Sequence, residues 1–141
     1  DQLIEQHIKS DDDFRQKNKI LRSAKGIGPI TSAVLIAQLP ELGRLNRQKI
    51  AALVGVAPYD FVSGRFAGKS RIWGGRKDIR SVLYMAATSA VRWNPVIRRF
   101  ANRLLKKGKA FKIVITACMR KLLIILNTMI RNQTLWHPEN I

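Results

Sequence analysis

Residues 76–131, RKDIRSVLYMAATSAVRWNPVIRRFANRLLKKGKAFKIVITACMRKLLIILNTMIR, decide the fold, because apolar residues recur in this stretch about every 3.6 positions. Asn94-Pro95 and Gly108 interrupt the pattern with residue types that begin and end helices. The stretch therefore predicts consecutive helices, the last of which runs from Phe111 to Arg131. We expect an all-α protein built as a helical bundle.

The segment before this stretch, residues 56–75, shows no helical period and is rich in glycine. Within it, Phe61-Val62 and Arg71-Ile72-Trp73 are candidate strands of one short hairpin. The sequence therefore predicts a long Gly-rich loop inserted into the helical bundle.

The sequence also predicts helices on the N-terminal side of the Gly-rich loop. Pro29 suits the first position of a helix that ends at Pro40. Asn46 suits the cap of a second short helix that stops at Gly55. Nearer the N-terminus a loose apolar stripe predicts one or two further helices, with Ser10–Asp13 as a candidate break and new cap.

These elements divide the chain into three parts. Residues 1–24 form a helical segment or linker from an upstream domain, residues 25–131 form the main domain, and residues 132–141 form an irregular tail. The chain opens at Asp1 in mid-helix by its pattern, so we expect it to be the C-terminal part of a longer protein.

Charge indicates the class of partner. The net charge is +17 on 141 residues, with 26 Lys and Arg against 9 Asp and Glu. From Gly43 to Arg131 there are twenty Lys and Arg, opposed only by Asp60 and Asp78. Such an excess predicts a nucleic-acid partner. Ribosomal and chromatin proteins carry similar charge, so the balance does not indicate a reaction.

The remaining composition excludes some alternatives. The single cysteine, Cys118, falls in an apolar helical stretch and is expected to be a buried small residue. Arg120 and Lys121 interrupt the longest apolar run, which favours a core helix and no membrane partner. No secretion signal is present, which fits a cytoplasmic, nucleoid-associated bacterial protein.

Gly26-Ile27-Gly28 is a candidate DNA-binding hairpin. Two glycines around an apolar residue, followed by a helix, resemble a helix-hairpin-helix element, whose backbone N–H groups bind a phosphate without reading sequence. A plain corner between two helices is the alternative, because the pattern is short.

Ser63 is the candidate nucleophile, because it lies in the flexible and strongly cationic part of the chain. Gly64 lets a bulky anion approach the backbone, and Asp60 is the nearby carboxylate that could orient or deprotonate the hydroxyl. A serine in a Gly-rich loop is more often a turn residue, so composition leaves catalysis open. The cations suited to holding phosphate are Arg65, Lys69, Arg71, Arg76, Lys77 and Arg80.

Metal catalysis within the chain is disfavoured. Two-metal phosphoryl transfer needs several carboxylates at one site, and the basic region supplies only Asp60 and Asp78. We expect no metal site and no cofactor in this chain.

Several motifs together resemble one family. They are Gly26-Ile27-Gly28-Pro29, Leu53-Val54-Gly55-Val56-Ala57-Pro58, Ser63-Gly64 with Gly68-Lys69-Ser70-Arg71-Ile72 and Gly74-Gly75-Arg76, Leu83-Tyr84-Met85-Ala86-Ala87, and Arg92 with Asn94-Pro95. In this spacing the chain resembles the C-terminal domain of the insertion-sequence-110 group of transposases, which is similar to the pilin-gene DNA invertases and includes bridge-RNA-guided recombinases. The resemblance covers about residues 20–131.

The resemblance implies a mechanism and partners. It makes Ser63 the nucleophile that attacks a DNA phosphodiester and forms a covalent phosphoserine link, which conserves the bond for rejoining. It also implies DNA as partner, a guide RNA as a further candidate, and a homo-oligomer, either a dimer or a tetramer. In the family a RuvC-like domain with four acidic residues comes first, and magnesium is expected there. The isolated fragment is therefore expected to be inactive, and a non-catalytic helix-hairpin-helix binding module is the alternative.

Overall fold

The computed structural model describes residues 2–58 and 76–140, and within these ranges every regular element is a helix. The expected all-α fold is therefore confirmed for the described residues, whereas the expected hairpin in residues 61–73 lies outside them. The elements in chain order are α1 (Gln2–Arg22), α2 (Pro29–Gln38), α3 (Arg47–Val54), α6 (Lys77–Trp93), α7 (Pro95–Lys106), α8 (Phe111–Asn132) and a 3₁₀ helix, η1 (Pro138–Asn140).

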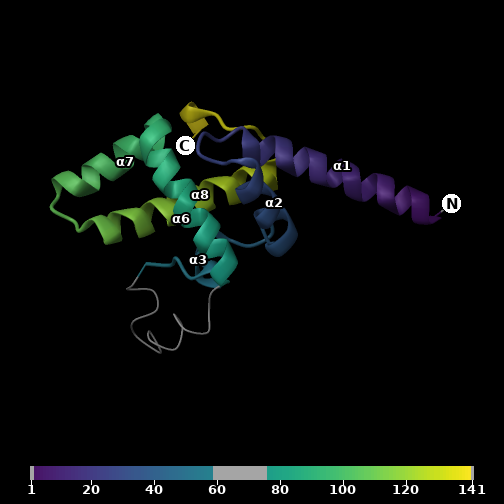
Figure 1. The fold of residues 1–141 in the computed structure, drawn as a ribbon, viewed down its shortest axis with the longest axis horizontal. Coiled ribbons are helices and arrows are strands. Elements are labelled where there is room, and N and C mark those ends of the chain that lie inside the picture. Colours follow the sequence, from purple (N-terminus) through teal and green to yellow (C-terminus); the bar gives the residue numbers. More distant parts are fainter. Residues whose placement is uncertain (1, 59–75, 141) are drawn as a thin grey trace.

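Helix α8 is the centre of the core. Helices α1, α3, α6 and α7 all contact it, and Figure 1 shows α6 crossing it while α7 folds back along it. By length and composition α8 could cross a membrane, but 61% of its most apolar window is buried inside this fold. This degree of burial is typical of a core helix, which is what the sequence predicts for this segment. Cys118 on α8 is fully buried, and burial raises the pKa of its thiol to about 11.

The predicted helix boundaries are largely confirmed. Pro29 opens α2, and the side chain of Asn46 accepts a hydrogen bond from the Lys49 N–H at the start of α3. Gly55 ends α3 in the left-handed conformation, with φ of 87°, which glycine adopts without a steric cost. The Asn94 side chain accepts hydrogen bonds from two N–H groups in the first turn of α7.

Of the one or two N-terminal helices that the sequence predicts, the structure has one, because α1 is continuous through the candidate break at Ser10–Asp13. Two of the acids there lie one turn from a cation, with Asp13 to Lys17 at 3.2 Å and Asp12 to Arg15 at 3.9 Å. Such pairs support an exposed helix. Figure 1 shows α1 projecting from the body, and only its last turn contributes buried residues, Ile20 and Leu21.

A buried asparagine fixes the loop between α2 and α3. Asn127 on α8 accepts a hydrogen bond from the Gly43 N–H at 2.6 Å and donates to the Leu45 carbonyl at 2.9 Å. Gly43 has φ of 87°, and a Cβ there would lie 2.7 Å from the side chain of Ile130. The loop can therefore lie against α8 only with glycine at this position.

Candidate nucleic-acid interface

Most of the predicted serine site lies outside the described residues: Asp60, Ser63, Gly64, Arg65, Lys69 and Arg71. Their roles remain predictions. The structure does describe the residues on either side of residues 59–75, which we name the serine stretch. The contacts at these two points determine how firmly the stretch is attached.

The upstream attachment is a hydrogen bond from α8. After α3 ends at Gly55, the carbonyl of Val56 accepts a hydrogen bond from the Arg120 guanidinium at 3.3 Å. Val56 itself is buried in the core. Arg120 is half-buried, and burial lowers its pKa. A cation in the middle of the core helix is thus used to hold the chain just before the serine stretch.

The downstream attachment is a bidentate ion pair. Arg76 donates to both carboxylate oxygens of Glu41, at 2.7 and 2.6 Å, and to the Gln38 carbonyl at 2.8 Å. These hydrogen bonds hold the pKa of Glu41 below its usual value and raise that of Arg76. Arg76 was predicted to contact phosphate, and its guanidinium already has a carboxylate partner. That prediction stands untested, and the structure adds a positioning contact.

The next two predicted cations lie in the first turn of α6. Lys77 is exposed and Arg80 is partly exposed. Neither makes an ion pair with a described residue, although Asp78 lies between them in the sequence. Both side chains therefore remain available to an anion at the end of α6 that follows the serine stretch.

The Gly26-Gly28 turn lies against α6. Gly26 has φ of 111°, and a Cβ there would lie 2.9 Å from the Ala90 Cβ. The side chain of Asn94 donates to the Lys25 carbonyl at 3.0 Å, so the asparagine that caps α7 also holds this turn. Gly28 meets nothing within 4 Å of an added Cβ and opens the N-terminus of α2. Gly26 is thus required for packing, whereas Gly28 faces open space.

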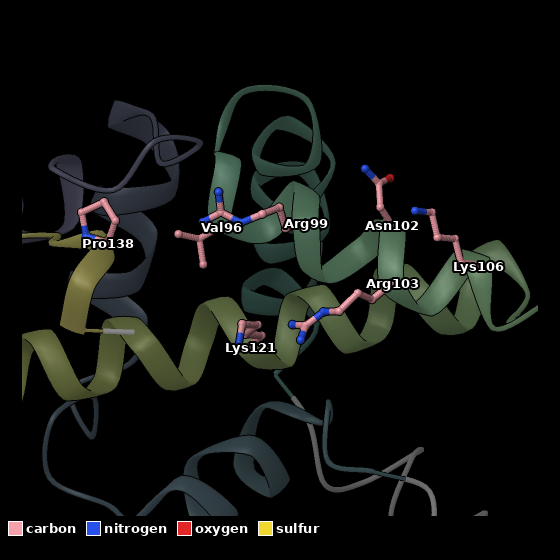
Figure 2. Close-up of a pocket in the computed structure, with 7 residues that line it drawn as sticks. All are labelled: Val96, Arg99, Asn102, Arg103, Lys106, Lys121 and Pro138. Atoms are coloured by element: carbon pink, nitrogen blue, oxygen red, sulfur yellow. The ribbon is translucent and has the colours of Figure 1, made fainter.

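The sequence prediction missed a basic pocket of about 500 Å³, which we name the α7–α8 pocket. Figure 2 shows its cationic side chains extending from α7 and from Lys121 on α8. The available signal was the absence of any Asp or Glu from residue 79 to residue 138. The pocket is lined by Val96, Arg99, Asn102, Arg103, Lys106, Lys121 and Pro138.

Metal-ligating side chains do not gather within the described ranges. Across residues 2–58 and 76–140 the structure holds no group of three or more His, Cys, Asp or Glu that could bind an ion. What this interface offers is exposed positive charge around two fixed attachment points, which suits anion binding.

Comparison with known proteins gives a consistent family. The family model described as the transposase IS116/IS110/IS902 family matches residues 18–102. The chain is 33% identical over 136 residues to the pilin gene-inverting protein of Moraxella bovis, covering 93% of this chain and 42% of that protein. It is 27% identical over 125 residues to the insertion element IS900 uncharacterized 42 kDa protein of Mycobacterium paratuberculosis, covering 85% of this chain and 31% of that protein. The chain thus spans less than half the length of these relatives.

Proposed function

This chain belongs to the IS116/IS110/IS902 family of transposases, and from that membership we propose that Ser63 is the nucleophile of a DNA transposase or site-specific recombinase. The Ser63 hydroxyl oxygen attacks a backbone phosphorus, a P–O bond of the DNA strand breaks, and a phosphoserine ester forms. The serine proton ends on the leaving oxygen, which becomes a free hydroxyl end. The reverse step, with a different hydroxyl end, joins a new partner strand.

The structural observation that supports this proposal is the attachment of the chain on both sides of the serine stretch. Arg120 holds the chain at Val56, and Glu41 holds it at Arg76, so the stretch begins and ends on one helical body. Nucleophilic attack on a phosphodiester needs the nucleophile at a fixed place relative to the bound backbone. Anchored ends on a basic body supply a frame for that placement.

Charge around the stretch supports the phosphate chemistry. A phosphoryl transition state spreads negative charge over its non-bridging oxygens, and arginines stabilise it. We propose that the DNA backbone is held by Arg65, Lys69, Arg71, Lys77 and Arg80. Phosphate contacts carry no sequence information, so a guide RNA or another part of the protein would select the target.

The activity is proposed for the whole protein and not for this stretch alone, because the chain covers 42% of its relative from Moraxella bovis. The upstream RuvC-like domain would bind magnesium, and the protein would act on two DNA sites as a dimer or tetramer.

The test is covalent trapping with the full-length protein. Element-junction DNA, guide RNA and magnesium are mixed with the protein, and adducts are resolved on a denaturing gel and mapped by peptide mass spectrometry. We expect nucleotide attached to Ser63, with loss of the adduct but not of DNA binding in Ser63→Ala. Ser70→Ala, which removes another hydroxyl from the same stretch, is the control and should retain the adduct. Strand cleavage without any protein adduct would overturn the proposal.

A second candidate is a non-catalytic helix-hairpin-helix module. The open space around Gly28, next to the N-terminus of α2, favours it, because backbone N–H groups there can meet a phosphate. In that case Ser63→Ala changes nothing, whereas a bulky side chain in Gly28→Val weakens DNA binding.

A further inference from the structure

We propose that the α7–α8 pocket is a second nucleic-acid site, which holds up to three neighbouring phosphates of one strand. The inference rests on the nucleic-acid binding in the proposed function and is independent of chemistry at Ser63. No prediction from the sequence assigned these residues a role.

The first argument is uncompensated charge. Four cations line the pocket, and the ion pairs among the described residues involve other cations, namely Arg15, Lys17 and Arg76. Glu139 follows Pro138 at the pocket wall, yet it makes no ion pair with any of the four. Clustered like charges repel one another, so such a cluster favours binding of an anion with several charges.

The second argument is spacing. Arg99, Arg103 and Lys106 lie at intervals of four and three residues, a spacing that places their backbone positions along one side of α7. At 1.5 Å per residue they extend over about 10 Å. A row of this length can contact two or three neighbouring phosphates of one strand, at most one for each cation. The pocket volume of about 500 Å³ leaves room for backbone between the walls.

The third argument is preorganisation of two of the cations. The ring of Phe100 lies 4.8 Å from the Lys121 ammonium and 5.8 Å from the Arg103 guanidinium. Cation–π contacts of this kind restrict where the charges can lie before a ligand arrives. Less entropy is then lost when a phosphate binds.

Helix α6 separates the start of α7 from Arg76, the described residue that follows the serine stretch. That helix has 17 residues, so its first and last residues lie about 24 Å apart. Arg76, the first described residue after the serine stretch, directly precedes α6, whereas α7 begins directly after the far end of that helix. A duplex that contacts both ends would cover about seven base pairs at 3.4 Å per pair. The pocket would therefore extend the footprint of the protein and add affinity without adding sequence information.

The test compares two variants of the full-length protein with the same loss of charge. The pocket variant, Arg99→Gln/Arg103→Gln/Lys106→Gln, removes three of the four positive charges that line the pocket. The α1 variant, Lys9→Gln/Lys19→Gln/Arg22→Gln, removes three exposed cations from α1. Binding to a labelled 25-base-pair DNA duplex and to a labelled RNA hairpin is measured by fluorescence anisotropy from about 50 to 200 mM salt. Melting curves establish that both variants fold, and Arg99→Lys/Arg103→Lys tests whether charge alone is sufficient.

We expect the pocket variant to flatten the slope of log affinity against log salt by roughly two to three, because about 0.9 is lost per phosphate contact. The α1 variant should retain the slope, and the arm that changes, DNA or RNA, identifies the strand. Equal effects of both variants, or no effect of the pocket variant on either probe, would overturn the proposal. Ser63→Ala should leave every slope unchanged, so failure of the serine chemistry would be seen separately, in the adduct assay.

Discussion

Arg76 and Arg103 are the same residue type in opposite electrostatic circumstances. Arg76 gives its guanidinium to both oxygens of Glu41 and to a backbone carbonyl. Arg103 lies beside three other cations and over the ring of Phe100, and no ion pair among the described residues includes it. The first arginine holds the fold at the edge of the serine stretch, whereas the second is available to a ligand.

The difference shows why a count of basic residues does not locate a binding site. Both arginines belong to the twenty Lys and Arg between Gly43 and Arg131. Whether such a residue stabilises the fold or binds an anion depends on whether the fold brings a carboxylate to it. The predictions below test this difference between paired and unpaired arginines. They begin with Asn127, which holds the loop that carries Glu41.

The largest effect is expected from Asn127→Ala, which removes the support of the loop that carries Glu41. The variant leaves the Gly43 N–H without its partner, whereas the Leu45 carbonyl still accepts a hydrogen bond from Arg131. An unsatisfied group of this kind costs about 1–3 kcal/mol when buried. We expect a loss of about 1–3 kcal/mol in the free energy of unfolding, measured by denaturant titration.

Thr128→Ala is the matched control, because this exposed neighbour on α8 donates only to its own helix. It should change stability by less than about 0.5 kcal/mol. If Asn127→Ala is equally mild, the loop does not depend on the buried side chain and Glu41 is not positioned by it.

The next effect is that of the ion pair itself. Arg76→Gln and Glu41→Gln should each destabilise the chain by about 1 kcal/mol, because the pair is bidentate but partly exposed to water. A melting temperature lower by about 3 °C would report this. In the double variant the effects should not add, and additivity in the cycle would mean that the two side chains do not interact in solution.

Acidity should remove the same contribution. The folded pKa of Glu41 is lowered from 4.5, chiefly by its hydrogen bonds from Arg76, so the carboxylate binds its proton less readily in the folded state. The stabilisation is therefore present above about pH 4.5 and is lost as the pH falls through the lowered folded value. The difference in melting temperature between the native chain and Glu41→Gln should shrink between about pH 6 and pH 3. If the difference in melting temperature stays constant over this pH range, the ionised carboxylate of Glu41 does not cause the stabilisation.

Local signals explain why much of the fold was predictable. Pro29, Asn46, Gly55 and Asn94 mark helix boundaries through their own backbone and side-chain chemistry, so the sequence alone locates them. The sequence did not decide between one and two helices at Ser10–Asp13, because the same residue types that cap a helix are tolerated inside an exposed one, where they pair one turn away.

Contacts between distant residues explain what the sequence could not give. Arg76 and Glu41 are 35 positions apart, and nothing in either segment indicates the pair. The α7–α8 pocket depends in the same way on how α7 lies against α8, which brings Lys121 to the row that begins at Arg99. The number of cations can be counted from the sequence, but the sequence does not show which of them have a carboxylate partner in the fold.

The smallest expected effect has the opposite sign. Arg99 lies one turn from Arg103 on α7, and like charges at this spacing destabilise a helix by about 0.2–0.5 kcal/mol. Glutamine has nearly the same helix propensity as arginine, so Arg99→Gln should remove repulsion at little other cost. We expect a melting temperature higher by about 1 °C at low salt.

The decisive result for Arg99→Gln is the sign of its change in melting temperature and how that change depends on salt. Salt at about 0.5 M should abolish the gain, because repulsion between exposed charges is screened. Arg76→Gln should still lower the melting temperature at that salt concentration, since it also loses a hydrogen bond to the Gln38 carbonyl. A loss of stability in Arg99→Gln comparable with that of Arg76→Gln would make Arg99 a structural residue. A gain that vanishes with salt is expected of a cation whose partner is not part of the chain.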